Sequence, residues 1–303
     1  MRVGRAELTS VLELEAGLVP LVGLCSGWDP ALVAEHADWL YPRHVDPVAG
    51  VVRLSHHSWL LRVDDLRVLV DPCIGNGKQR PSPPDAYYER LDTPWLDRLV
   101  AAGSHPDAID VVVCTHLHPD HCGWNTQLVD GRWVPTFPNA RYVLSAPEVA
   151  FWSAFAQEPD RFPELSYNRG VFEDSVAPVL DAGLVQLLDA GDTLAPGITL
   201  MGTPGHTVGH WSVCYADDLD GICFSGDTLH SPVHVLHPEW GVGPGPGAHH
   251  DAAAAAASRR RVLDHCADTG HLLAPAHFQA PHTCRIAHGA DGGYGLTWST
   301  DVA

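Results

Sequence analysis

Short apolar runs separated by polar turns dominate this chain from Val51 onward. Ser58–Val63 and Leu66–Val70 flank the polar pair Asp64-Asp65, and this pattern predicts a β-hairpin. Ile109–Cys114 is rich in β-branched residues and is typical of a fully buried strand. Similar runs predict six further strands, of which the last named here is the last clear strand of the chain: Arg141–Leu144, Leu184–Leu188, Ile198–Met201, His210–Tyr215, Gly221–Phe224 and His271–Pro275.

Helical patterns alternate with these strands. Leu96–Ala102, Pro147–Ala156 and Ala252–Ala267 are predicted helices, and the last contains neither glycine nor proline. The strands and helices form two successive blocks without a break in composition. We therefore expect one domain over residues 1–303, built from two sheet-plus-helix halves.

Three segments depart from this alternation. Residues 1–50 are predicted to form an N-terminal extension of mixed helical and irregular structure. Residues 80–95 are rich in proline and are expected to wrap the surface. Gly241–Gly247 is a loop too short and too stiff to link two domains.

The charge and hydrophobicity of the chain exclude several kinds of partner. The formal net charge is −19 at pH 7, which disfavours nucleic acid and anionic membrane surfaces. No window approaches the roughly 18 apolar residues of a transmembrane helix, and the N-terminus lacks the apolar core of a signal peptide. Hydrophobic residues make up 45% and charged residues 18%, a globular composition. We expect a small molecule as the partner, and neither nucleic acid nor a membrane.

The cysteines indicate the cellular compartment. The chain has 8 cysteines, none of them in a CxxC pair. Several lie in apolar runs, as Cys114 and Cys223 do, which is typical of buried free thiols in a reducing compartment. A cytoplasmic location is therefore predicted.

Residues that bind metals concentrate directly after the Ile109–Cys114 strand. Residues 115–121 read Thr-His-Leu-His-Pro-Asp-His, which places four ligand-capable side chains close together: His116, His118, Asp120 and His121. Imidazole nitrogens and carboxylate oxygens are ligands that zinc, manganese and iron accept. A loop at a strand end can turn His116 and His118 toward one metal while Asp120 and His121 reach a second.

One loop cannot complete two metal spheres, so further ligands are expected at later strand ends. His206 follows the Ile198–Met201 strand, Asp227 follows Gly221–Phe224, and His277 follows His271–Pro275. A single histidine or aspartate at a strand end is usually structural. Their recurrence in order after the His-rich loop favours a shared metal centre.

The string HxHxDH, followed by a single His, then Asp, then His, resembles the metallo-β-lactamase superfamily over about residues 51 to 280. This resemblance implies an α+β fold, a four-layer αβ/βα sandwich with the metal site at one edge. It implies two metal sites that share Asp227: the first held by His116, His118 and His206, the second by Asp120, His121 and His277. Asp71, at the end of Leu66–Val70, corresponds to an aspartate that lies behind the first-metal histidines and orients them.

The resemblance also implies a hydrolytic mechanism. Two divalent metal ions, zinc first and manganese or iron as alternatives, lower the pKa of a shared water and polarise the bond under attack. Asp120 is the expected residue to orient the nucleophile and move a proton to the leaving group. We expect hydrolysis of a lactone, ester, thioester, amide or organophosphate.

His230 bears on the branch of the superfamily. Acyl-homoserine lactonases of this fold tend to have a tyrosine three residues after the bridging aspartate, where this chain has His230. The Asp-x-x-His arrangement and the stretch Leu117–Asn125 instead resemble the methyl parathion hydrolase-like branch. His230 is interpreted either as a catalytic residue that protonates a leaving group or touches substrate, or as a capping or core histidine.

The sequence gives less evidence for a functional role of the other histidines, of Cys122 and of several aromatic residues. The remaining histidines considered are expected to be structural or on the surface: His56, His57, His210 and the pair His249-His250. Cys122 adjoins His121 but is expected to pack, because the ligand set is complete without it. A group of aromatic residues is a candidate apolar wall for a largely apolar substrate: Trp124, Phe151, Trp152, Phe155 and Trp240.

Two other functions remain as alternatives to the binuclear hydrolase. A mononuclear iron oxygenase of the same fold, acting on a sulfur compound, would require an empty second site. A metal-binding protein without enzymatic activity is the weakest alternative, because no ligand is missing. A flavodiiron reductase is disfavoured, because His118 is intact and no flavin-binding segment is present. The oligomeric state is left open, and a homodimer would find its interface in residues 1–50.

Overall fold

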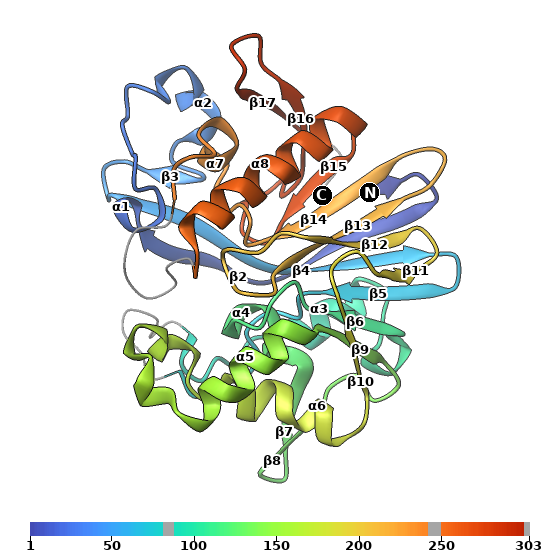
Figure 1. Cartoon of the computed structure of the whole chain (residues 1–303). Coiled ribbons are helices and arrows are strands. Elements are labelled where there is room, and N and C mark those ends of the chain that lie inside the picture. Colours follow the sequence, from blue (N-terminus) through green and yellow to red (C-terminus); the bar gives the residue numbers. More distant parts are fainter. Residues whose placement is uncertain (81–87, 242–249, 300–303) are drawn as a thin grey trace.

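Two β-sheets lie face to face, and helices cover their outer faces, in the computed structural model of the chain (Figure 1). The structure describes residues 1–80, 88–241 and 250–299. The predicted α+β fold, a four-layer αβ/βα sandwich, is confirmed by this arrangement.

The first sheet has the strand order β1-β2-β4-β5-β6-β9-β10, with β3 paired to β4. The run from β5 through β6 and β9 to β10 is parallel, so these strands end at a common edge. The strands are β1 (Arg2–Val3), β2 (Ala6–Pro20), β3 (Val45–Asp46), β4 (Val51–Val63), β5 (Leu66–Val70), β6 (Val111–Val113), β9 (Arg141–Ser145) and β10 (Val185–Leu188).

The second sheet has the strand order β11-β12-β13-β14-β15-β16-β17. Only the β14–β15 pair is parallel among its described strands. Its strands are β11 (Thr193–Ala195), β12 (Ile198–Gly202), β13 (Trp211–Ala216), β14 (Gly221–Gly226), β15 (Leu272–Pro275), β16 (Cys284–His288) and β17 (Tyr294–Trp298). A separate hairpin joins β7 (Thr126–Val129) to β8 (Arg132–Pro135).

Helices pack on the outer face of each sheet (Figure 1). The longest, α8 (Ala252–Thr269), begins where the Asp251 side chain accepts the Ala253 and Ala254 N–H groups at 3.0 Å, and it ends at Gly270, whose φ is 72°. The other α-helices are α1 (Leu21–Leu24), α2 (Ala37–Leu40), α3 (Trp95–Ala101), α4 (Pro119–Cys122), α5 (Ala146–Gln157), α6 (Ala177–Asp181) and α7 (Val233–Leu236). A π-helical turn covers Phe172–Val176.

The alternation of side chains along the strands separates two cores. In β6, Val111 and Val113 face the second sheet and join the central core between the sheets, whereas Val112 packs toward α3. β14 follows the same rule, since Phe224 faces the central core and Cys223 packs against α8. Continuous apolar runs arise because both faces of these strands are covered.

The prediction for residues 1–50 is wrong over Ala6–Pro20, which form the long strand β2 paired with β4. The register shifts between Leu12 and Leu14 and again between Leu14 and Gly17. Leu8 and Val11 are both buried although an odd number of positions separates them, because Leu8 faces the core between the sheets and Val11 faces the core under α3. An alternating pattern is therefore not visible in the sequence. The short helices α1 and α2 follow, as expected.

The other predicted elements are present, although β4 begins at Val51 and not at Ser58. The strands β7, β8 and β11 and the helix α6 are among the elements that the sequence pattern did not predict. His271–Pro275 is not the last strand, because β16 and β17 extend the second sheet beyond it. Residues 81–87 of the proline-rich segment and most of Gly241–Gly247 lie outside the described residues. In the described part of the chain, no helix combines the length and the apolarity that crossing a membrane requires.

Candidate metal centre

The seven predicted metal ligands meet at one edge of the two sheets. Four of them leave the carboxyl end of β6, on the following segment and on α4, and three follow strands of the second sheet. They are His116, His118, Asp120, His121, His206 after β12, Asp227 after β14 and His277 after β15. Parallel strands end at the same edge of a sheet, and this property brings side chains from distant sequence positions together.

Asp227 lies at the centre of this group. Its Oδ2 atom is 3.2 Å from Nε2 of His206 and 3.8 Å from Nε2 of His116. Its Oδ1 atom is 3.1 Å from Nε2 of His121 and 2.9 Å from Nε2 of His277. One carboxylate therefore presents each of its oxygens to a different pair of imidazoles.

The ligand atoms fall into two sets that share Asp227. His116, His118, His206 and Asp227 each place one ligand atom within 4.8 Å of the others. His121, Asp227 and His277 do the same on the other side. Asp120 borders this second set, with Oδ1 3.7 Å from His121 Nε2 and Oδ2 3.6 Å from His277 Nε2. The division matches the one that the family resemblance implied.

The residues fit a pair of divalent cations. All seven are buried except Asp120, whose side chain is 12% exposed. Nε2 of His116, Nε2 of His121 and Oδ1 of Asp227 are buried and make no hydrogen bond within the described structure. Buried polar atoms rarely lack a partner, and these point at one another. Imidazole and carboxylate donors in this number suit zinc, and also iron or manganese.

The second nitrogen of several ligands is held by the protein. Nδ1 of His118 faces the centre, 2.9 Å from Nε2 of His206, while its Nε2 lies 3.1 Å from the Tyr167 hydroxyl. Nδ1 of His277 lies 3.0 Å from the carbonyl oxygen of Ser55 and donates to it. Such contacts fix the tautomer and the ring orientation of a metal ligand.

The pKa shifts follow from burial and from the carboxylates. Burial lowers the pKa of His116 and of His118 well below the ordinary histidine value, so both rings are neutral and offer a lone pair. Burial acts in the same direction on His121, but carboxylates led by Asp227 outweigh it and raise its pKa well above that value. Burial raises the pKa of Asp227, yet His121 and His277 outweigh burial and lower it far below the usual range. The centre therefore favours positive charge.

Asp71 lies behind the centre, but its contacts differ from the prediction. Its carboxylate accepts the Thr115 N–H at 2.6 Å and the Thr115 hydroxyl at 2.8 Å, and its Oδ2 lies 3.0 Å from Nδ1 of His121. It reaches the first set only indirectly, because the Thr115 hydroxyl is 3.1 Å from Nδ1 of His116. Asp71 therefore orients a ligand of the second set directly, because α4 turns the His121 ring back toward the end of β5.

His230 lies inside the cluster. Its Nε2 is 3.1 Å from Oδ2 of Asp227, and its ring stacks on that of His277 with 5.7 Å between centroids. Burial lowers the pKa of His230 to about 4. His210, expected to be structural, accepts the Asp227 N–H with its Nε2 at 3.1 Å, and its Nδ1 lies 2.8 Å from the Thr203 hydroxyl. It thereby positions the backbone of Asp227.

A protein-family model described as the metallo-beta-lactamase superfamily matches residues 51–269, well over half of the chain. The chain belongs to the metallo-beta-lactamase superfamily. The matched residues include every predicted metal ligand except His277, which lies just after β15.

Solved structures of this superfamily fold are similar over the whole chain. AbOPH, a hydrolase in the beta-lactamase superfamily, is 23% identical, with a TM-score of 0.76 over 99% of this chain and 96% of its own. AidC, a dizinc quorum-quenching lactonase in complex with the product N-hexanoyl-L-homoserine, is 20% identical, with a TM-score of 0.76 over 100% and 97%. A probable metal-dependent hydrolase from Staphylococcus aureus is 16% identical, with a TM-score of 0.75 over 100% of both chains. At these identities the likeness shows the fold.

The predicted enzyme class, a metal-dependent hydrolase of the metallo-beta-lactamase superfamily, is confirmed at that level. The methyl parathion hydrolase-like branch remains a prediction, because the similar structures are hydrolases and lactonases and do not single out one branch.

Two residues that touch the centre were not assigned to it from the sequence. His56, on β4, was expected to be structural, but its Nδ1 lies 3.5 Å from Oδ2 of Asp120. The Tyr88 hydroxyl donates a hydrogen bond to the same oxygen, with 3.1 Å between the two oxygens. Neither follows a strand end in the manner of the predicted ligands. His56 reaches the centre because β4 passes beside it, and Tyr88 reaches it from a loop.

Glu148, on α5, is a further residue that the sequence did not single out. It is fully buried, and its carboxylate accepts three N–H groups: Leu117 N at 3.2 Å, Gly209 N at 2.7 Å and Trp152 Nε1 at 2.8 Å. Leu117 lies between two ligands of the β6 segment, and Gly209 belongs to the segment that carries His206. One carboxylate therefore ties two ligand-bearing loops to the same helix.

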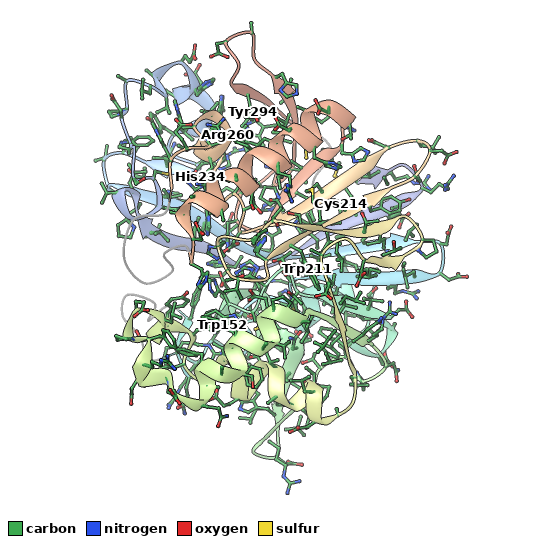
Figure 2. The ribbon with its side chains drawn as sticks, viewed as in Figure 1. Trp152, Trp211, Cys214, His234, Arg260 and Tyr294 are labelled. Carbon is green, nitrogen blue, oxygen red and sulfur yellow. The ribbon has the colours of Figure 1, made fainter. Side chains whose placement is uncertain are left out.

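The predicted apolar wall is only partly correct. A narrow pocket opens beside the first set of ligands, and Phe151 and Trp152 of α5 line it together with Leu165, Tyr167 and Val208. Figure 2 shows Trp152 in the helical layer outside the first sheet. Three of the predicted wall residues lie elsewhere: Phe155 in the core under α5, Trp124 stacked on Trp95 at 5.2 Å, and Trp240 against the N-terminal segment. Burial against other elements removes these three from the pocket.

The remaining minor expectations concern residues that do not enter the ligand sets. Cys122 packs in the core below α4, and the 8 cysteines are all free and buried. His57 points away from the centre, with Nδ1 2.9 Å from the Ser55 hydroxyl. His250 is exposed and lies at the rim of the pocket, whereas His249 lies outside the described residues.

Proposed function

We propose that this chain is a binuclear metal-dependent hydrolase. His116, His118 and His206 would hold the first cation, and Asp120, His121 and His277 the second. Asp227 would bridge them. The observation that carries the proposal is the division of the Asp227 oxygens, one toward each imidazole set.

The chemistry of the proposed reaction combines the cations with residues of this chain. When bound, two divalent cations lower the pKa of water and polarise a carbonyl or phosphoryl oxygen. Asp120 is the most exposed of the ligand set and borders the second half of the centre. We assign it the orientation of the attacking water and the transfer of a proton toward the leaving group. His230, 3.1 Å from Asp227, is the candidate for contact with the substrate or its leaving group.

A small, mostly apolar ester, lactone or organophosphate-like compound is the proposed substrate. The pocket beside the first set presents aromatic and aliphatic side chains, including Phe151, Trp152 and Val208. Apolar walls with a few polar groups are typical of sites for such ligands. The dizinc lactonase AidC, whose product carries an apolar acyl chain, supports a lactone among the candidates.

Zinc is proposed in both positions, because nitrogen-rich sites with carboxylates suit it. We also propose the methyl parathion hydrolase-like branch, on the basis of Asp227-x-x-His230 and the stretch Leu117–Asn125.

Elemental analysis of protein purified without an affinity tag or chelator tests the proposal. Close to two equivalents of zinc, manganese or mixed metal per chain would support it. A panel of chromogenic esters, lactones and phosphotriesters would then identify the bond cleaved. Close to one equivalent of iron, with thiol-dependent oxygen uptake and no hydrolysis, would replace it with the oxygenase alternative.

A further inference from the structure

His56, on β4, lies beside the second ligand set. It is 1% exposed, and its ring packs edge-on against His277 with 5.0 Å between centroids. One ligand atom each from His56, Asp120 and His277 lie within 4.8 Å of one another. This is a third group of metal-ligating atoms, and it shares two residues with the proposed second cation site.

Hydrogen bonds determine which nitrogen of His56 carries the proton. The Tyr88 hydroxyl donates its single proton to Oδ2 of Asp120 at 3.1 Å. The same hydroxyl lies 3.2 Å from Nε2 of His56, and with its proton already donated it acts there as an acceptor. Nε2 of His56 is therefore the protonated nitrogen, and Nδ1 carries the lone pair.

The lone pair of Nδ1 points at other lone pairs. Nδ1 of His56 lies 3.5 Å from Oδ2 of Asp120. Nε2 of His277 lies 3.6 Å from the same oxygen, and in the neutral ring it carries the lone pair because Nδ1 of His277 donates to the Ser55 carbonyl. Three acceptors that converge in a buried place repel one another unless a cation lies among them.

We propose that His56 is an additional ligand of the second cation, which it would bind through Nδ1 alongside Asp120 and His277. The inference rests on the proposed binuclear function and deepens it. Tyr88 is then a positioning residue, because it holds both the Asp120 oxygen and the His56 tautomer.

The fold makes room for this ring. Gly17 of β2 pairs with Leu54, and a Cβ atom at Gly17 would come within 2.8 Å of Nε2 of His56. The register shift of β2 between Leu14 and Gly17 places this glycine there. The neighbouring His57 points to the opposite face of β4, as the alternation of a strand requires. His56 is therefore directed into the centre by the pairing of β2 with β4.

A third imidazole near the second cation would change its metal preference. With His121, His277 and His56, the second site offers three imidazoles together with Asp120 and Asp227. Imidazole ligands suit zinc, cobalt, nickel and iron better than manganese or magnesium. We therefore expect the second site to discriminate against manganese.

Titration of chelator-treated protein with Co²⁺, followed by visible absorption and by competition with a chromogenic chelator, tests the inference. His56→Phe keeps a ring of similar size but has no ligand atom. We expect its second Co²⁺ equivalent to bind at least about 100-fold more weakly, beyond the roughly 10–100-fold that loss of an outer partner costs. Its ligand-field spectrum should change, while the first equivalent should be unaffected. His57→Phe, on the same strand and facing away, is the matched control and should bind both equivalents as the wild type does.

Tyr88→Phe is the second variant, in case His56→Phe does not fold. It retains Nδ1 of His56 but removes the group that fixes the tautomer, so the second equivalent should bind about 10-fold more weakly. Wild-type affinity and spectrum in His56→Phe, or unchanged affinity in Tyr88→Phe, would overturn the role of His56 while leaving the binuclear hydrolase intact. A wild-type protein that binds only one equivalent would overturn both proposals.

Discussion

At the scale of single residues, Asp227 determines the character of the centre. Five imidazole nitrogens lie within 3.8 Å of its two oxygens: Nε2 of His116, His121, His206, His230 and His277. Its backbone is held as well, because its N–H donates to His210. A side chain fixed at both ends can bridge two cations without reorganising, which is the property that electrostatic catalysis requires.

Replacing Asp227 should therefore remove metal and activity together. In Asp227→Ala the two imidazole sets lose the carboxylate between them, and with it the negative charge that would offset both cations. We expect most of the bound metal and nearly all turnover to be lost, as measured by elemental analysis and by hydrolysis of the best substrate in the panel. Full activity in this variant would contradict the ligand assignment.

His230 should behave differently, because it contacts Asp227 but belongs to neither ligand set. We expect His230→Ala to retain two metal equivalents and to lower kcat by roughly 100-fold to 10,000-fold, the usual range for loss of a general acid–base residue. Metal content and steady-state kinetics measured on the same preparation separate the two effects. Unchanged kinetics would make His230 a structural residue.

At the scale of elements, α5 organises both halves of the ligand-bearing edge. Its Glu148 holds the β6 segment through Leu117 and the β12–β13 segment through Gly209. The same helix presents Phe151 and Trp152 to the pocket. A shift of α5 would therefore move both the proposed metal ligands and the wall of the pocket.

Glu148→Ala should weaken the fold and the centre. It leaves three buried N–H donors without their acceptor, each at a cost of about 1–3 kcal/mol. We expect a lower free energy of unfolding in urea for the chelator-treated protein, and a lower affinity for the first metal equivalent. Glu158→Ala, at the exposed end of the same helix, is the matched control. Equal stability of the two variants would show that Glu148 does not hold the loops.

Some residues of the centre could be predicted from the sequence, and others could not. His116, His118, Asp227 and His277 stand next to apolar runs, so local sequence identifies both the strand and the ligand beyond it. His56 depends instead on the pairing of β4 with a bulged β2. Tyr88 and Glu148 reach the centre from a loop and from a helix. Contacts of this kind depend on tertiary packing, which leaves no periodic signal in one sequence.

At the scale of the whole molecule, buried neutral histidines outside the ligand sets should make the fold sensitive to acid. His44 is 1% exposed, and its ring stacks on Trp298 with 4.9 Å between centroids. Burial lowers the pKa of His44 to about 3, whereas the unfolded chain titrates near the ordinary value of about 6.5. Burial likewise lowers the pKa of His57 and of His234 well below that value. Between these limits the unfolded chain binds more protons than the folded one.

The free energy of unfolding should therefore fall as the pH drops below about 6.5, by up to about 1.4 kcal/mol per pH unit for each such histidine. His44→Phe removes one of these titrating groups and keeps an aromatic ring stacked on Trp298. The free energy of unfolding should therefore fall less steeply with decreasing pH, by about the contribution of one histidine. Urea unfolding of chelator-treated wild type and variant at pH 7.5, 6 and 5 measures the two slopes, and the ligand histidines contribute equally to both. Parallel slopes would show that His44 becomes protonated in the folded state, and would move the origin of acid sensitivity to the remaining buried histidines.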